Sequence, residues 1–144
     1  NAPIIEGGVV KQYFVSTYMS EKTGFEPTVE DISRPCLMPF VKDGGLSDIE
    51  KGVSLKDILK LSGNGIYVTG FNGGNCNPVT GDFSFGIEGF AFSKGRISHP
   101  VREMLITGNI IELWNGLMAA GSDTRPSARW QIPTLAFEDV SFSA

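Results

Sequence analysis

The stretch that decides the fold is "DFSFGIEGFAFSKGRISHPV", residues 82–101. Its large apolar side chains fall at alternate positions on either side of a break: Phe83, Phe85 and Ile87 before it, Phe90 and Phe92 after it. Because side chains alternate strictly across a strand, all of them can share one face only if an extra residue is accommodated near Gly89. The Ser-Lys-Gly at 93–95 is typical of a turn, and residues 96–101 form the returning strand. The stretch therefore predicts a long hairpin with a β-bulge at Gly89.

Outward from this hairpin, the apolar patterns predict further strands and short helices. The predicted strands are residues 9–15, 65–71, 102–108 and 133–144, with "CLMPFV" at 36–41 as an irregular strand broken by Pro39. One predicted helix begins at Ser16 or Thr17 and ends at Gly24, one runs from a capping box at Ser54 and Asp57 to Gly63, and one is capped by Asn109 and carries Leu117 on its apolar side. Residues 25–51 otherwise predict an ordered but irregular connection.

These elements predict an α+β fold, with a predominantly antiparallel β-sheet or a barrel-like core and about three short helices. A length of 144 residues suits a single domain, 1–144. The chain begins with "NAPIIEGG", which has neither an initiating Met nor the pattern of a signal peptide. We therefore expect a fragment of a longer chain.

Composition and charge argue against two classes of partner. The net charge is −4, and the 12 Lys and Arg residues are scattered rather than gathered in a basic stripe. Affinity for nucleic acid depends on clustered basic residues, so no nucleic acid is expected to bind. Apolar runs such as residues 117–120 are far shorter than the ~20 residues that cross a bilayer, so no membrane span is expected.

Glycine, asparagine, a thiol and a carboxylate crowd into "GFNGGNCNPVTGDFSFG", residues 70–86. No Lys follows the glycines as a phosphate-binding P-loop requires, and a strand rather than a helix follows them, which argues against a dinucleotide fingerprint. A single carboxylate, Asp82, is too few for an EF-hand site. The segment predicts a shaped turn, in which Gly73 and Gly74 adopt positive φ, Asn77 starts the turn and Asp82 accepts backbone hydrogen bonds; a binding loop remains the alternative.

Candidate ligands for a metal and candidate nucleophiles are few. The chain has one histidine, His99, which Pro100 follows at once, and two cysteines, Cys36 and Cys76. Zinc hydrolases use three protein ligands, usually with two histidines one helical turn apart, and no Gly-x-Ser-x-Gly nucleophile motif occurs. We expect free thiols, a surface histidine, and no catalytic, cofactor-binding or metal-ligating residue in this chain.

A family resemblance rests on the order and spacing of several blocks. "NPVTGDFSFGIEGF" is followed by "PVREMLITGN", then by "AAGSD" and a closing "PTLAFEDVSF". Together they resemble the C-terminal half of the TldD/PmbA family, historically called modulators of DNA gyrase. The resemblance extends over essentially the whole chain, since "IIEGGVVKQYFVSTYMSEKTG" is similar to the strand and helix that precede the variable connection of that family.

The resemblance implies a zinc-dependent peptidase built from two related subunits, one catalytic and one lacking the metal ligands. In catalytic members, two histidines of a His-Glu-x-x-x-His helix lie upstream of this region, and a cysteine near the C-terminus completes the site. The corresponding segment here, "GSDTRPSARWQIP" at 121–133, contains no cysteine. Cys76 lies in a different block, where the family requires no ligand. The chain therefore resembles the non-catalytic, PmbA/TldE-like branch, with zinc implied only in the catalytic partner subunit and with a cytoplasmic location.

The motif positions are predicted to shape the fold or to bind peptide rather than to catalyse. They are Gly73, Gly74, Asn77, Thr80, Gly81, Asp82, Pro100, Gly108, Asn109, Asp123 and Pro133. The implied partners are a TldD-like catalytic subunit and, through the complex, a peptide substrate. Two alternatives stay open: a fragment of a catalytic TldD-like zinc peptidase whose metal helix is absent here, and a direct modulator of DNA gyrase, which the acidic charge opposes.

Overall fold

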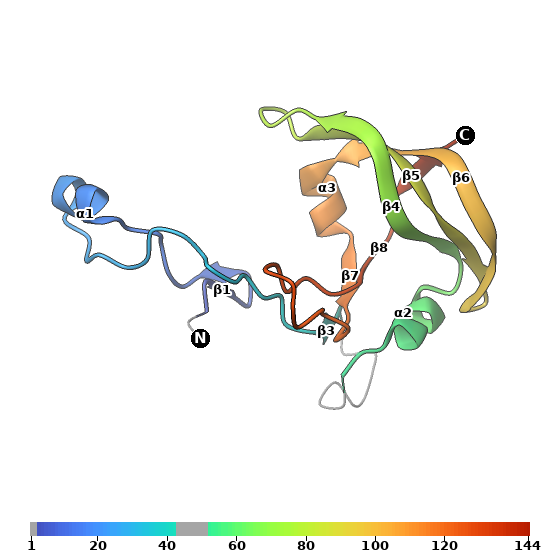
Figure 1. The fold of residues 1–144 in the computed structure, drawn as a ribbon, viewed down its shortest axis with the longest axis horizontal. Coiled ribbons are helices and arrows are strands. Elements are labelled where there is room, and N and C mark those ends of the chain that lie inside the picture. The colour runs from blue at the N-terminus through green and yellow to red at the C-terminus, as the bar shows by residue number, and fades with distance from the viewer. Residues whose placement is uncertain (1–2, 43–51) are drawn as a thin grey trace. The chain divides into compact units, whose positions relative to one another are not determined.

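The computed structural model describes residues 3–42 and 52–144 (Figure 1). The chain divides into two compact units, Asn1–Pro35 and Cys36–Ala144, and each is described by itself. The described strands form one two-stranded, one three-stranded and one four-stranded sheet, all with antiparallel pairing and none closed into a barrel. Together with the three helices of the described ranges, they confirm the predicted α+β class.

The first unit contains a small hairpin and a short helix. Strands β1 (Ile5–Glu6) and β2 (Val9–Val10) pair across a turn in which Gly7 and Gly8 have φ of +57° and +77°. Such a pair of left-handed residues suits the twist of a two-residue hairpin, and glycine adopts it without steric cost. Helix α1 (Thr17–Thr23) follows. The predicted ends of this helix are confirmed, with Ser16 as its N-cap and Gly24 in the left-handed conformation at its C-terminus.

The strand predicted for residues 9–15 is shorter in the structure, because it ends at Val10. The backbone groups of Val15 bond to a loop instead of a neighbouring strand. Its N–H donates to Thr28 Oγ1 at 3.0 Å, and its carbonyl accepts from the N–H of Thr28 at 2.9 Å. β-branched content alone predicted an extended segment here, and the absence of a pairing strand decided its actual length.

In the second unit, helix α2 (Leu55–Ser62) belongs to the same apolar core as the three-stranded sheet. That sheet has the order β3 (Phe40–Val41), β7 (Leu117–Ala120) and β8 (Leu135–Phe137). The core cluster joins all these elements: Val41, Val53, Ile58, Ala119 and Ala136, with Leu61 and Met118 packed against it. The predicted capping box is confirmed, because the side chains of Ser54 and Asp57 each bond to the other's backbone N–H.

The four-stranded sheet carries the hairpin predicted from the sequence. Its order is β4 (Gly65–Cys76), β5 (Asp82–Ser93), β6 (Arg96–Asn109) and β9 (Ser141–Ser143) (Figure 1). The turn between β5 and β6 places Lys94 and Gly95 at φ of +51° and +69°, which confirms the turn at Ser-Lys-Gly. Strand β6 is continuous through 96–109, so the separate strands predicted at 96–101 and 102–108 are one.

The predicted bulge at Gly89 is confirmed. Ile87 pairs with Met104 but Gly89 pairs with Val101, so β6 has one residue more than β5 in this interval. The pairing of β5 with β4 shifts at the same place. The bulge does not bring every aromatic ring inside, however: Phe90 remains 37% exposed, whereas Phe92 is 7% exposed. The extra residues lie on β4 and β6, so β5 keeps its strict alternation at Gly89 and the Phe90 ring faces the opposite side of the sheet from Ile87.

The helix after Asn109 is shorter than predicted. Helix α3 (Ile110–Asn115) ends at Gly116, whose backbone N–H donates to the carbonyl of Glu112. The carbonyl of Gly116 accepts from the N–H of Glu138 at 2.9 Å, so the chain leaves the helix there. Leu117 consequently begins strand β7 instead of extending the apolar side of the helix. Ala119 and Ala120 on β7 are fully buried, so pairing in the core outweighs local helix propensity here.

The predicted terminal strand 133–144 divides into two. β8 belongs to the three-stranded sheet and β9 to the four-stranded sheet, with Asp139 at φ +57° in the link between them. The change of apolar parity at this point in the sequence thus marks a change of sheet. In the irregular connection, "CLMPFV" contributes β3 and a bridge between Cys36 and Gln131, whereas Gly44 and Gly45 lie outside the described residues.

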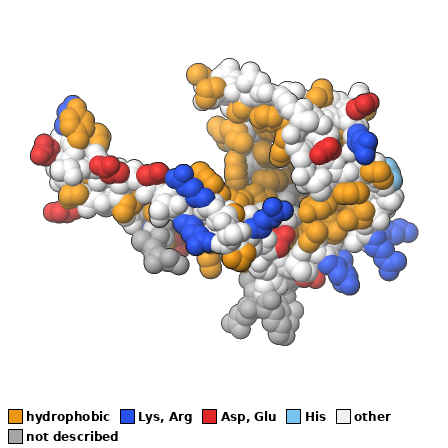
Figure 2. Space-filling model, in the orientation of Figure 1, with side chains coloured by type: hydrophobic (Ala, Val, Ile, Leu, Met, Phe, Trp, Pro, Cys, Tyr) orange, Lys and Arg blue, Asp and Glu red, His pale blue; other side chains and the backbone are white. Residues whose placement is uncertain are grey.

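Several large apolar side chains of the second unit remain exposed. Figure 2 shows hydrophobic side chains gathered on the face in view. Among the strands of the four-stranded sheet, Phe71 is 66% exposed, Ile97 50% and Leu105 45%. None of the helices in the described ranges has the length and apolar content needed to span a membrane.

Candidate functional site

The glycine pair of the predicted turn lies within strand β4 instead, which corrects that prediction. Gly73 and Gly74 have φ of +82° and +127°, and the register with β5 shifts between Phe71 and Gly74. A side chain on Gly74 would run into the carbonyl oxygen of Ser84 on β5. The two glycines therefore form a bulge that lets β4 continue to Cys76, and only glycine fits the close approach at position 74.

The turn itself runs from Asn77 to Gly81 and is closed by its own hydrogen bonds. Asn77 Oδ1 accepts from the backbone N–H groups of Val79 at 2.9 Å and Thr80 at 3.4 Å. The N–H of Gly81 donates to the Asn77 carbonyl at 2.8 Å, with Gly81 at φ +82°. This is the local bonding by which asparagine initiates a turn, so the role predicted for Asn77 is confirmed.

The turn is fastened to the N-terminus of helix α3 by three of the predicted residues. Asp82 Oδ1 accepts from Asn109 Nδ2 at 3.0 Å, and Asp82 Oδ2 accepts from Thr80 Oγ1 at 2.8 Å. Asn109 Nδ2 also donates to the Thr80 carbonyl at 2.8 Å, while its Oδ1 caps α3 by accepting from the N–H of Ile111 at 3.0 Å. One asparagine therefore links the hairpin to the helix.

This network sets the charge state of Asp82. The hydrogen bond from Asn109, followed by that from Thr80, lowers the pKa of the Asp82 carboxyl below its ordinary value, although the group is exposed. Both carboxylate oxygens are engaged within the turn. The geometry suits a group that holds the turn in shape. The predicted backbone hydrogen bonds to Asp82 are wrong, because both donors are side chains, Asn109 Nδ2 and Thr80 Oγ1.

Removing the Asp82 carboxylate is expected to loosen this turn. Asp82→Asn keeps one acceptor oxygen, and the Thr80 hydroxyl can rotate to accept from the new amide, whereas Asp82→Ala loses both bonds. Melting temperatures at pH 7 should therefore fall in the order wild type, Asp82→Asn, Asp82→Ala. Because the folded pKa is lowered, the contribution exists above the unfolded value of 3.8 and is lost as the pH falls through the folded value.

Asp139→Asn is the matched control, because Asp139 lies in an exposed link and asparagine tolerates its positive φ. Thermal unfolding followed by circular dichroism at pH 7 and at acidic pH measures all variants. The wild type and Asp82→Ala should converge at acidic pH. If Asp82→Asn instead melts like wild type but the assembled protein loses its function, then the negative charge of Asp82 has a functional role beyond holding the turn.

Two further predicted residues lie along the hairpin. Gly108 pairs with Phe83, and a side chain there would meet the Phe83 ring at 3.2 Å. Pro100 pairs with Phe90 in the part of β6 that β9 does not cover, since β9 pairs only with Leu105 to Thr107. A proline cannot donate to a neighbouring strand, so this uncovered edge is where the sheet tolerates one.

The last two predicted residues, Asp123 and Pro133, belong to a different place, the loop between β7 and β8. Asp123 clamps the ends of this loop together: its Oδ1 accepts from the N–H of Thr134 at 2.8 Å and its Oδ2 accepts from Thr134 Oγ1 at 2.6 Å. Gly121 lies so close to the Asp123 carboxylate that a side chain at position 121 would meet Asp123 Oδ1 at 2.7 Å. The side chain of Gln131 bonds across the loop to the carbonyls of Arg125 and Ala128.

Two opposing effects act on Asp123. Partial burial raises the pKa of its carboxyl, but the side-chain and backbone hydrogen bonds from Thr134 together outweigh burial and lower the pKa overall. The carboxylate is thus ionised, with both oxygens occupied. Its two hydrogen bonds with Thr134 join the beginning of the β7–β8 loop to its end.

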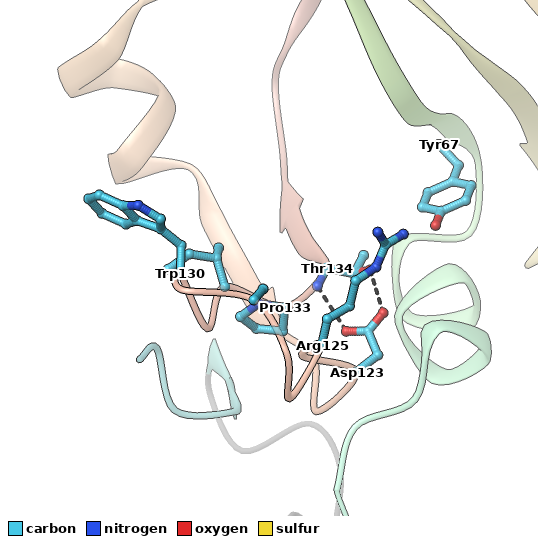
Figure 3. Close-up of a pocket in the computed structure, with 8 residues that line it drawn as sticks. Tyr67, Asp123, Arg125, Trp130, Pro133 and Thr134 are labelled. Atoms are coloured by element: carbon cyan, nitrogen blue, oxygen red, sulfur yellow. Dashed lines mark hydrogen bonds between the residues drawn. The ribbon is translucent and has the colours of Figure 1, made fainter. Parts of the chain in front are cut away.

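A pocket of about 290 Å³ lies between this loop and strand β4 (Figure 3). Its lining residues are Tyr67, Asp123, Arg125, Ala128, Trp130, Ile132, Pro133 and Thr134. Sequence reasoning missed Tyr67, Arg125 and Trp130, and the distance along the chain between Tyr67 and the loop left no local signal for them. The predicted site residues thus divide between a turn at α3 and a pocket at the β7–β8 loop.

The described residues do not fit a zinc ion. Among them, no three His, Cys, Asp or Glu side chains are grouped so that they could hold a metal. Cys36 and Cys76 are free and exposed. His99 is exposed on β6, with its Nδ1 3.1 Å from Ser98 Oγ. A second pocket, of about 440 Å³, lies beside α3 and is lined by Glu112, Glu138 and Asp139 among others, but Glu138 forms an ion pair with Lys42 at 3.0 Å.

The described residues define the class of this chain as an α+β domain built on antiparallel sheets and closed, hydrogen-bonded loops. The chain belongs to the family described as the PmbA/TldA metallopeptidase C-terminal domain, whose sequence profile matches residues 1–144.

Named relatives and solved structures agree with this assignment. The chain is 27% identical to "Metalloprotease PmbA" of Escherichia coli O157:H7 over 97% of its own length, and 26% identical to a "Metalloprotease TldD homolog" of Buchnera aphidicola over 85%. Two crystal structures, each matching 97% of the chain, are described as candidate modulators of DNA gyrase. That from Bacteroides thetaiotaomicron is 40% identical with a TM-score of 0.69, and that from Thermotoga maritima is 26% identical with a TM-score of 0.77. The chain spans only 26–32% of these proteins.

Proposed function

We propose that this chain is the C-terminal domain of a non-catalytic, PmbA/TldE-like subunit, which pairs with a TldD-like zinc-bearing subunit in a cytoplasmic peptidase acting on peptides or unfolded segments. The observation that carries the proposal is the β7–β8 loop. Residues 121–133 contain neither Cys nor His. Asp123, the one carboxylate of this segment, has both oxygens occupied by Thr134. The loop that would complete a metal site in a catalytic member has no side chain to offer.

Exposed apolar surface supports the pairing with another subunit. Phe71, Ile97 and Leu105 lie on strands of one sheet with about half or more of their surface in solvent. In the sheet register Phe71 is opposite Ile87 and Leu105 is opposite Gly86, so these two exposed side chains lie on opposite faces of the sheet. A related subunit that covers one of these faces would remove part of this apolar area from water.

Metal analysis of the full-length protein tests the proposal. After purification in zinc-containing buffer and desalting, the protein alone should hold well below one zinc per chain and should cleave no unfolded peptide. The catalytic partner, prepared in the same way, is the positive control for zinc. Adding the zinc-bearing partner should restore cleavage, and the two proteins should co-elute in size-exclusion chromatography.

One tightly held zinc per chain, removed only by a chelator, would overturn the non-catalytic assignment and favour the alternative of a catalytic TldD-like peptidase. The matches to relatives named as TldD homologues make this alternative worth the test. A gyrase supercoiling assay with the protein alone separates the third alternative, a direct action on gyrase, for which the net charge of −4 offers no basis in DNA affinity.

A further inference from the structure

The pocket at the β7–β8 loop brings one cationic and one phenolic donor to the same side of the loop. In Figure 3 the Arg125 side chain extends from the loop toward Tyr67, which projects from β4. Both residues line the pocket. A guanidinium presents several N–H donors in a planar fork, and a phenol adds one O–H donor.

Neither donor is used by another described group. The Arg125 guanidinium forms no ion pair or hydrogen bond with another residue in the ranges 3–42 and 52–144. Tyr67 likewise has no hydrogen-bond partner for its hydroxyl within this described part. The nearest acid of the loop, Asp123, directs both oxygens to Thr134. The donors of Arg125 and Tyr67 are therefore open to an acceptor from outside the chain.

The rest of the pocket lining is mixed in polarity, and the pocket is small. Asp123 and Thr134, which are bonded to each other, contribute polar atoms, and the apolar atoms come from Ala128, Trp130, Ile132 and Pro133. A volume of about 290 Å³ is near the lower end of ligand pockets, which run from roughly 300 to 1,000 Å³. The space suits one amino-acid residue rather than a large ligand.

We propose that this pocket binds a peptide carboxylate, with Arg125 pairing with the carboxylate and Tyr67 donating to it. A guanidinium fits a carboxylate through two parallel hydrogen bonds, which explains a single arginine at the site. A dianionic phosphate would ordinarily recruit more positive charge than this one residue. The inference shares with the proposed function only the assumption that peptides are the ligand, and it requires neither zinc nor catalysis.

Calorimetric titration of the full-length protein with matched peptides tests it. The probes are an N-acetylated tripeptide ending in leucine with a free carboxylate, the same peptide as its C-terminal amide, and an amidated version with aspartate before the leucine. We expect the free acid to bind about tenfold or more tightly than the neutral amide, as a hydrogen-bonded charge pair contributes. Tight binding of the amidated aspartate peptide would assign the carboxylate to a side chain, and weak binding would assign it to the C-terminus.

Four variants locate the effect. Arg125→Gln should abolish the preference for acid over amide, Arg125→Lys should retain part of it, and Tyr67→Phe should reduce it while keeping the ring. Arg96→Gln, at the exposed start of β6, is the matched charge control and should retain the full preference. Circular dichroism verifies that each variant is folded. Equal affinity of the wild type for acid and amide, or an undiminished preference in folded Arg125→Gln, would overturn the proposal, whatever the zinc content of the protein.

Discussion

The Gly89→Ala substitution is expected to lower the free energy of unfolding by about 1–3 kcal/mol or more, as overpacking does at a site that cannot relax. An added Cβ at Gly89 would run into the backbone carbonyl of Tyr67 on β4 and lie 3.0 Å from the Cα of Val68. Both are main-chain atoms of a paired strand, so relief requires separating β4 from β5 at the bulge. In an unobstructed strand, alanine would instead stabilise by reducing the flexibility of the unfolded chain.

Chemical denaturation with urea, followed by circular dichroism, measures this loss. Gly108→Ala is the matched control on the neighbouring strand, because its Cβ would meet only the Phe83 ring, at 3.2 Å, and a ring can move aside. The control should cost much less than Gly89→Ala. Equal midpoints for wild type and Gly89→Ala would contradict the close approach of the two strands at the bulge.

The Ile87→Ala substitution is expected to destabilise the protein by about 2–5 kcal/mol, the usual cost of truncating a buried aliphatic side chain. Ile87 is 1% exposed at the centre of β5, between Phe71 on β4 and Met104 on β6. Since β5 is an inner strand with long neighbours on both sides, little rearrangement can fill the cavity. Domains commonly have only about 5–15 kcal/mol of stability, so this change alone takes a large share.

Two variants bracket that result in the same denaturation experiment. Ile87→Val removes one methylene group and should cost only about 0.5–1.5 kcal/mol. Ile97→Ala makes the same chemical change on the same hairpin at a side chain that is 50% exposed, so it should cost far less than Ile87→Ala. Similar losses for Ile87→Ala and Ile97→Ala would show that burial at position 87 is not what the structure describes.

Local sequence signals predicted the parts of the fold that neighbouring residues build together. The caps at Ser16, Ser54 and Asn109 were predictable because a side-chain oxygen satisfies an N–H only a few residues away. The hairpin at 82–101 was predictable because strict alternation on two adjacent strands needs only one turn between them. The bulge at Gly89 followed from a parity change within ten residues of that turn.

The candidate site was only partly predictable for the same reason. Asn77, Thr80 and Asp82 lie in one turn, so their mutual bonding could be read from their spacing. Asn109 joins them only because β6 returns beside β5 and delivers it there. At the β7–β8 loop, resemblance pointed to Asp123 and Pro133, but the residues with free donors, Arg125 and Tyr67, had no such signal.

The sequence by itself determined the α+β class, the helix caps, the main hairpin with its bulge, and the exclusion of a helical zinc motif, since all of these depend on residue types and short spacings. Only the tertiary structure decided that "LMAA" at 117–120 is a buried strand, because its partners β3 and β8 lie far away in the chain. It also divided the C-terminal strand between two sheets. The pocket likewise depends on contacts between distant parts of the chain. Folding brings Tyr67 of β4 to a loop more than fifty positions further along, and a local sequence pattern carries no information about such a long-range contact.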